Sequence, residues 1–138
     1  MPDEAQADQN IAREINQLIE MPRGEFEELV AGLYRALGHQ AMCVPANGER
    51  DIDVVVGARN GQKWIVQCRQ WRGAVGEVVV RELYAAMRRE HAAQAAIITT
   101  AKFTPKAREW AKGKPIHLYD GVGFLKAMKR IREKASAD

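Results

Sequence analysis

The spacing of apolar residues changes along the chain and divides it into expected helices and strands. Apolar residues three or four positions apart predict amphipathic helices, and alternation or a short apolar run predicts strands. The predicted helices span 7–19, 24–37 and 76–90, with two more that begin at Thr104–Pro105 and after Asp120. The predicted strands span 41–44, 51–58, 62–70, 95–100 and 116–118. Strands separated by helices indicate an α/β fold.

The segment Arg59-Asn60-Gly61 between two alternating strands predicts a β-hairpin. Three residues that end in glycine suit a hairpin loop whose last position is left-handed. Ala58 then lies opposite Gln62. This register predicts one apolar face with Ile52, Val54 and Val56 across from Cys68, Val66 and Trp64. Such a face is suited to packing under helices.

The other face of the predicted hairpin carries polar side chains at one end. The same register places Asp51 and Asp53 beside Gln67 and Arg69, with Asp53 directly across from Gln67. A two-residue turn would shift the register by one position and turn Asp53 toward Cys68 and Val66. Burying a carboxylate among those groups is costly, so the three-residue loop is favoured.

The polar end of this hairpin resembles the active site of Mrr-type restriction endonucleases, a branch of the PD-(D/E)xK nuclease superfamily. Their catalytic domain carries an aspartate strand followed by a Gln-x-Lys strand. The resemblance covers 24–30, 37–38, Asp53, 67–71, 80–84, 98–100, 103–104 and 116–121. It implies a restriction-endonuclease-like fold, a central mixed β-sheet flanked by helices. The expected organisation is a leading helix within 1–20, an Mrr-like nuclease domain over 21–134 and a frayed tail over 135–138.

The resemblance also implies the roles of individual residues. Asp53 corresponds to the metal carboxylate, Glu27 to an acid that completes the metal site, and Gln67 to a neutral ligand or water holder. The backbone carbonyl of Cys68 is the remaining implied ligand, and Arg69 stands at the position of the catalytic lysine. The implied cofactor is Mg²⁺ or Mn²⁺, and magnesium needs only one or two carboxylates because it keeps several waters.

Arg69 is the departure from the family pattern, and it leaves two functions open. Lysine can help to deprotonate water, whereas arginine keeps its charge and can only bind a phosphate or stabilise negative charge. One reading is a metal-dependent DNA endonuclease in restriction or defence against foreign or modified DNA. The alternative is a catalytically impaired nuclease fold that serves as a DNA-binding or protein-interaction module. A structural dimer subunit is a third reading.

Other candidate residues have an ordinary reading beside the functional one. Arg72, Lys102 and Lys106 lie near the ends of predicted elements, where basic side chains often meet phosphates but are usually just solvated. Trp71 either flanks the DNA or covers the edge of the sheet. Without the resemblance, Glu27 would be a first-turn carboxylate favoured by the helix dipole.

Composition agrees with one domain of 138 residues. A net charge of +3, from 21 basic and 18 acidic residues, permits DNA binding without indicating it. Two cysteines without zinc spacing, a polar start and no long apolar run predict a cytoplasmic protein that binds no membrane. DNA is the expected partner. Cleavage of both strands would need two sites and hence a homodimer, and the resemblance implies a separate DNA-reading domain or system component.

Overall fold

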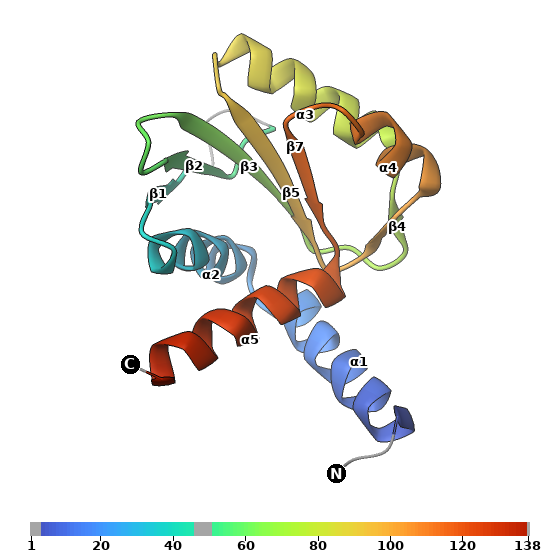
Figure 1. Cartoon of the computed structure of the whole chain (residues 1–138). Coiled ribbons are helices and arrows are strands. Elements are labelled where there is room, and N and C mark those ends of the chain that lie inside the picture. The colour runs from blue at the N-terminus through green and yellow to red at the C-terminus, as the bar shows by residue number, and fades with distance from the viewer. Residues whose placement is uncertain (1–3, 46–50, 138) are drawn as a thin grey trace.

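The computed structural model of the chain describes residues 4–45 and 51–137 (Figure 1). Its helices are α1 (Glu4–Glu20), α2 (Arg23–Ala36), α3 (Glu77–Arg89), α4 (Pro105–Ala111) and α5 (Gly121–Ala137). Its strands are β1 (Gln40–Cys43), β2 (Val54–Gly57), β3 (Lys63–Arg69), β4 (Ala74–Val75), β5 (Gln94–Thr99), β6 (Lys102–Phe103) and β7 (Ile116–Tyr119). All five predicted helices and all five predicted strands are therefore present.

Five of the strands form one mixed sheet in the order β1-β2-β3-β5-β7. The neighbours β1, β2 and β3 are antiparallel, whereas β3, β5 and β7 are parallel. The parallel strands are linked through α3 and α4, as parallel pairs require a long crossover. A second, parallel pair of two-residue strands, β4 and β6, was not predicted, because two residues are too few to carry a periodic pattern.

Helices cover both faces of the sheet, with α3 and α4 on one side and α2 and α5 on the other (Figure 1). The core under α3 and α4 includes Ile65, Val80, Leu83 and Ile97. The core under α1, α2 and α5 includes Leu18, Phe26, Val30, Val66 and Phe124. The predicted α/β architecture, a central mixed sheet flanked by helices, is confirmed.

The hairpin of β2 and β3 has the predicted loop and register. Gly61 has a φ of 86°, and the Ala58 amide donates to the Gln62 carbonyl at 2.8 Å. Val54 pairs with Val66, and Val56 pairs with Trp64. The three-residue loop that the sequence favoured is confirmed.

The regular pairing stops at Asp53, and this changes which residues share a face. The Asp53 amide donates to the Val66 carbonyl at 2.9 Å, although Val66 is already the partner of Val54. Ile52 consequently packs with Ile65 in the core under α3 and α4, not with Val54 in the core under α2. The prediction that Ile52 lies on the face of Val54 was wrong, because strict alternation holds only while the strand pairs regularly.

The two helices that the sequence predicts to begin at Thr104–Pro105 and after Asp120 are each capped by a side chain. The Thr104 hydroxyl accepts from the Ala107 amide at 3.1 Å, and an Asp120 carboxylate oxygen accepts from the Gly123 amide at 2.8 Å. Helix α5 continues to Ala137, and Asp138 lies outside the described residues, so the frayed tail over 135–138 stays a prediction. Within the described ranges, no helix has the length and apolar character needed to cross a membrane.

Candidate active site

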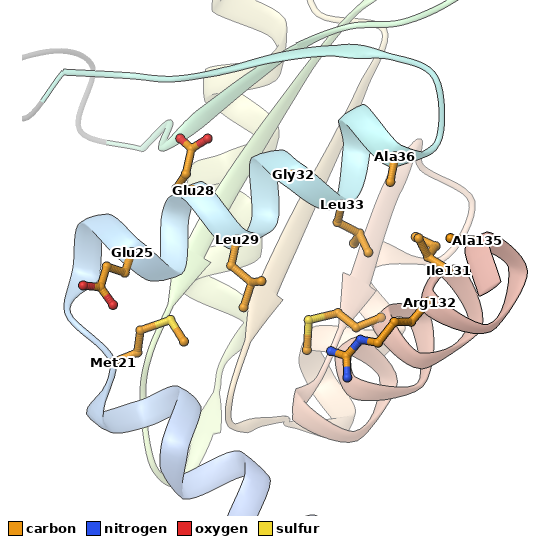
Figure 2. A pocket seen from close by; sticks show the side chains of 11 residues that line it. Met21, Glu25, Glu28, Leu29, Gly32, Leu33, Ala36, Ile131, Arg132 and Ala135 are labelled. Atoms are coloured by element: carbon orange, nitrogen blue, oxygen red, sulfur yellow. The ribbon is translucent and has the colours of Figure 1, made fainter.

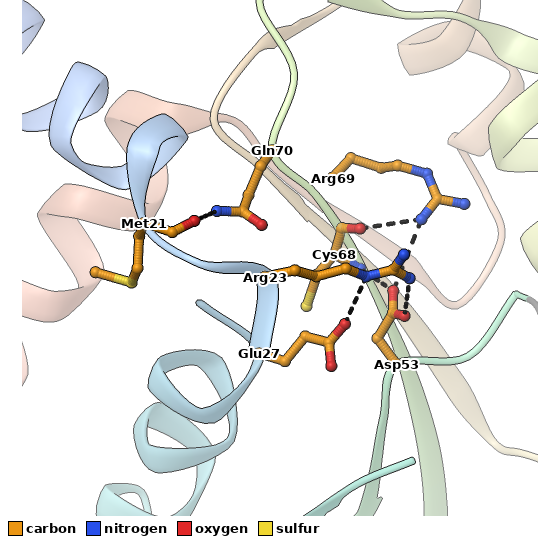
Figure 3. Close-up of polar contacts among 7 residues, drawn as sticks. All are labelled: Met21, Arg23, Glu27, Asp53, Cys68, Arg69 and Gln70. Carbon is orange, nitrogen blue, oxygen red and sulfur yellow. Dashed lines mark hydrogen bonds and ion pairs between the residues drawn. The ribbon is translucent and has the colours of Figure 1, made fainter. Parts of the chain in front are cut away.

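Asp53 is the centre of a polar cluster where β2 and β3 meet the start of α2 (Figure 3). It is only 5% exposed. Its Oδ2 accepts a hydrogen bond from the Cys68 backbone amide at 2.7 Å, and its Oδ1 accepts one from Arg23 Nη2 at 3.1 Å. Arg69 Nη1 lies 3.7 Å from Oδ2. The buried carboxylate is therefore compensated by one backbone N–H and two guanidinium groups, as a buried charge requires.

Glu27 reaches the same cluster from the first turns of α2. Its Oε1 accepts from Arg23 Nε at 2.9 Å, and its side chain is 13% exposed. A single guanidinium thus bridges Glu27 and Asp53, and the two ion pairs raise the pKa of Arg23. Residues 26 positions apart in the sequence have been brought within reach of one shared cation.

Arg69 closes another side of the cluster. Its Nη1 donates to the Cys68 carbonyl at 3.0 Å, and its guanidinium carbon lies 5.6 Å from the centre of the Trp71 ring. The side chain is 19% exposed. The cation at the lysine position therefore lies beside Asp53, as predicted, and it is held by a carbonyl and an aromatic ring.

The Cys68 thiol is not a reactive group of this site. Burial, together with the charges of Asp53 and Glu27, raises the pKa of Cys68 well above its usual range. The thiol is therefore protonated at neutral pH and is a poor nucleophile. Only the backbone N–H and carbonyl of Cys68 contribute to the polar cluster.

Gln67 is fully buried on the strand that carries Arg69. Neither its Nε2 nor its Oε1 has a hydrogen-bond partner among the described residues. The expected direct pairing with Asp53 is not formed, because pairing leaves the regular register at Asp53 and its carboxylate binds Cys68, Arg23 and Arg69 instead. A buried amide without a partner is costly and is characteristic of a functional position.

A polar opening of about 630 Å³ lies next to this cluster. Arg23, Asp51, Cys68, Arg69, Gln70 and Trp71 line it. Trp71 is 41% exposed there, and it offers an aromatic surface beside two guanidinium groups. The opening therefore has the charge to receive an anion and an aromatic ring to contact its neighbouring groups.

A second groove of similar size separates α2 from α5 and has a different character (Figure 2). Leu29 and Leu33 of α2 face Ile131 of α5 across it, and Gly32 lies between the two leucines along α2. Glu25, Glu28 and Arg132 are its charged lining residues. None of the polar cluster residues lines this groove, whereas Arg23, Cys68 and Arg69 of the cluster line the polar opening.

The family model of the restriction endonuclease catalytic domain, Mrr_cat, matches residues 18–128. The chain belongs to this restriction endonuclease family. The match includes Glu27, Asp53, Gln67 and Arg69, so the entire polar cluster lies within the Mrr_cat domain.

Known relatives carry this domain as part of longer chains. The type IV methyl-directed restriction enzyme EcoKMrr of Escherichia coli K12 is 28% identical over 122 residues, which cover 83% of this chain and 40% of that protein. The chain thus spans less than half the length of this relative.

Two solved restriction endonucleases share the fold at low sequence identity. The DNA modification-dependent endonuclease AspBHI has a TM-score of 0.67 and 17% identity, with 94% of this chain and 36% of that chain covered. MspJI, solved in complex with a 27-mer oligonucleotide, has a TM-score of 0.62 and 16% identity, with 95% and 33% covered. The Mrr_cat domain described here therefore has the restriction-endonuclease fold.

The donor groups of the Mrr_cat domain fit a magnesium-type ion. Among the described residues, no group of three or more histidine, cysteine or acidic side chains could hold a metal. Mg²⁺ nevertheless prefers few carboxylates and several waters. The cluster matches this preference, because it offers two carboxylates within reach of one cation, a backbone carbonyl and a buried amide. Asp53, Glu27, the Cys68 carbonyl and Gln67 are the groups that could supply these oxygens.

The DNA-binding candidates on other elements are not drawn together. Arg72 donates to Asn16 of α1 at 3.0 Å. Lys102 and Lys106 are exposed on β6 and α4, and neither lines the polar opening. Only Trp71 of this group lines the opening.

The sequence predicted no role for Arg23 of the polar cluster or for Gln70, which lines the adjacent opening. Arg23 lies four positions before Glu27, a spacing that places both on one helix face and could have indicated the pair. Gln70 Nε2 donates to the carbonyls of Leu18 and Met21 at 2.9 and 2.7 Å, which attaches the end of α1 to the end of β3. No local pattern signals that contact, because its partners lie about fifty residues away.

Proposed function

We propose that this Mrr_cat domain is a metal-dependent DNA endonuclease that hydrolyses phosphodiester bonds in restriction of foreign or modified DNA. The observation that carries the proposal is the meeting of Asp53 and Glu27 on one cation, beside Arg69 and the Cys68 carbonyl. Paired carboxylates next to a fixed positive charge are what metal-assisted phosphodiester hydrolysis needs.

The metal-binding residues in this proposal are Asp53, Glu27, Gln67 and the Cys68 carbonyl. Mg²⁺ or Mn²⁺ bound there would supply an acidic water and positive charge for the phosphate. The Cys68 amide orients Asp53 through Oδ2, so that the other oxygen can face a cation. Gln67 can hold a ligand or water through either of its polar atoms, since neither is used by another described residue.

Arg69 binds phosphate in this proposal and does not act as a base. A guanidinium stays protonated throughout the accessible pH range, so it cannot accept a proton from water. Only Nη1 is hydrogen-bonded among the described residues, which leaves further N–H donors for phosphate oxygens. Its charge then stabilises the negative charge that develops in the transition state.

The proposed partner is DNA, and the relatives suggest the kind of DNA. EcoKMrr is described as methyl-directed and AspBHI as modification-dependent, so modified DNA is the first substrate to test. We further propose a homodimer for cleavage of both strands and a separate DNA-reading unit, since the chain spans only part of these relatives. The two free cysteines agree with a cytoplasmic location.

A second candidate function is favoured by one observation, arginine at the lysine position. A nuclease fold with impaired catalysis would bind DNA, or a protein partner, without cutting. Salt dependence separates DNA binding from protein binding. Binding through phosphates weakens steeply as the salt concentration rises, whereas recognition of a protein need not.

Plasmid cleavage tests the proposed function. Methylated and unmethylated supercoiled plasmid would be incubated with Mg²⁺ or Mn²⁺ and the parent, Asp53→Ala or Arg69→Lys protein, with Asp8→Ala as an exposed carboxylate control. We expect nicked or linear DNA from the parent and from the Asp8 variant but none from Asp53→Ala. Cleavage only by Arg69→Lys would support the impaired-site alternative. Absence of cleavage by every variant on both plasmids would overturn the endonuclease proposal.

A further inference from the structure

Arg23 is the cation that both site carboxylates share, and it lies outside the residues assigned to metal or phosphate so far. Its Nε contacts Glu27 Oε1 at 2.9 Å, and its Nη2 contacts Asp53 Oδ1 at 3.1 Å (Figure 3). Both nitrogens belong to one planar group, so the guanidinium fills the gap between the carboxylates.

We propose that Arg23 competes with the divalent metal for Asp53 and Glu27, and that metal binding releases it to bind a DNA phosphate. The inference rests on the proposed function, since it requires a metal at these carboxylates. An ion coordinated by both groups needs the space in which the guanidinium lies, and two cations that close together repel each other.

The two arginines of the site differ in how firmly they are held. The Arg23 side chain is 71% exposed, and among the described residues it hydrogen-bonds only to Glu27 and Asp53. Arg69 is 19% exposed and also contacts Cys68 and Trp71. Once a metal ion compensates the two carboxylates, Arg23 can therefore turn into solvent, whereas Arg69 keeps its contacts with Cys68 and Trp71 and stays in place.

A released Arg23 would remain at the polar opening. Arg23 lines that opening together with Arg69 and Trp71, and α2 begins at Arg23, so its backbone is fixed there. A phosphate that approaches Arg69 would then lie within reach of a second guanidinium. Metal binding should for this reason strengthen DNA binding through Arg23, in addition to the charge that the metal itself brings.

Mn²⁺ affinity measures the competition directly. Electron paramagnetic resonance of free Mn²⁺ would be followed for the parent, Arg23→Ala, Asp53→Ala and Arg81→Ala. Arg81 is the matched control, because it forms an i,i+4 ion pair with Glu77 on α3, at 3.1 Å. We expect Arg23→Ala to bind Mn²⁺ roughly three- to tenfold more tightly, in proportion to the modest strength of such ion pairs. Arg81→Ala should match the parent, and Asp53→Ala should lose the site.

Arginine Nε–H signals in nuclear magnetic resonance distinguish direct displacement from a general charge effect. The Arg23 signal is assigned by its loss in Arg23→Lys, and Mg²⁺ is then added to the unaltered protein. We expect the Arg23 signal to shift and to exchange faster with water as its bond to Glu27 breaks, while the Arg69 signal persists. Because this measurement needs no destabilising variant, it remains decisive if Arg23→Ala folds poorly.

The outcomes separate this inference from the proposed function. Tighter Mn²⁺ binding by Arg23→Ala together with loss of the protected Arg23 signal supports the competition. A second outcome is metal binding that depends on Asp53, with an unchanged Arg23 signal and equal Mn²⁺ affinities of the parent and Arg23→Ala. This outcome overturns the competition and leaves the endonuclease proposal intact. If no metal binding depends on Asp53, the metal site of the proposed function fails, and the competition fails with it.

Discussion

The Asp53 carboxylate and the Cys68 backbone amide are joined by a 2.7 Å hydrogen bond that connects the start of β2 to the end of β3. The bond forms where regular strand pairing stops, since the Asp53 amide itself binds the Val66 carbonyl. Regular strand pairing is therefore lost at Asp53, and the Asp53 carboxylate is instead buried and held in a fixed orientation. Asp53 therefore has a structural role through this hydrogen bond, in addition to its proposed metal-binding role.

The two roles of Asp53 can be separated by comparing Asp53→Asn with Asp53→Ala. Asparagine still offers an oxygen to the Cys68 amide, whereas alanine leaves that buried N–H without a partner, at a cost of about 1–3 kcal/mol. We expect Asp53→Asn to have the higher free energy of unfolding in urea denaturation, and both variants to lose Mn²⁺ binding. Equal stabilities would show that the hydrogen bond to Cys68 contributes little.

We predict that the Gln67 side chain lowers the free energy of unfolding of the domain and contributes to metal binding. Gln67→Met keeps the length of the side chain but removes two buried polar atoms that lack partners among the described residues. We expect its free energy of unfolding to rise by about 1–2 kcal/mol, because an unpaired polar group is costly to bury, and its Mn²⁺ affinity to fall.

Gln94 on the neighbouring strand is the matched control for Gln67. Its Oε1 lies 2.9 Å from His117 Nε2, so this amide already has a partner. Gln94→Met should therefore gain no stability and should leave Mn²⁺ affinity unchanged. A gain of the same size in both variants would attribute the effect to side-chain hydrophobicity and not to the missing partner.

The elements of the fold could be predicted because their signals are local. Thr104 and Asp120 cap helices within three residues of themselves, and Gly61 determines the hairpin loop. The register of β2 and β3 followed from that loop. These features depend on neighbours in sequence, which a pattern of residues contains.

The failures arose where distant contacts decide the geometry. Ile52 turned to the opposite face because Asp53 leaves the ladder to reach Cys68, and alternation alone carries no signal of that break. Arg23 was missed because its importance depends on Asp53, which lies thirty residues away. The sequence thus predicted the types of residue in the candidate site, but not which arginine side chains pair with its carboxylates.

The Cys43 thiol should react slowly at neutral pH. Burial, and then its hydrogen bond to the Glu28 carboxylate, raises the pKa of Cys43 to about 11 from an ordinary value of 9.0. Since only the thiolate reacts, alkylation at pH 8 should be roughly a hundredfold slower than for a free thiol of ordinary pKa. The rate at Cys43 would be followed from pH 7 to 12 by mass spectrometry of the labelled peptide.

The same shift has a defined sign for stability. The folded state holds the Cys43 proton more tightly than the unfolded state, so its contribution is complete below pH 9 and is lost as pH rises toward 11. Glu28→Gln removes the neighbouring negative charge and should move the alkylation midpoint to lower pH. A midpoint that stays near 9 in the parent would contradict the effects of burial and of Glu28.

Two glycines should respond to alanine in opposite directions. A Cβ at Gly121 would lie 2.6 Å from the Thr100 carbonyl oxygen, a backbone atom that cannot easily move. Gly121 also donates its amide to the Ala101 carbonyl at 3.1 Å, which fixes the start of α5 against the end of β5. We expect Gly121→Ala to lower the free energy of unfolding by about 1–3 kcal/mol, the usual cost of overpacking.

Gly32 in α2 is the contrasting position, because a Cβ there meets no atom within 4 Å. Gly32→Ala should raise the free energy of unfolding by about 0.5–1 kcal/mol, since alanine loses less backbone freedom in a helix. Urea denaturation of both variants measures the two changes against the same parent. A loss of stability in both variants would contradict the open space at Gly32 in the groove between α2 and α5. If neither variant lost stability, α5 would have to shift away from Thr100 without cost, which its buried Phe124 and Leu125 oppose.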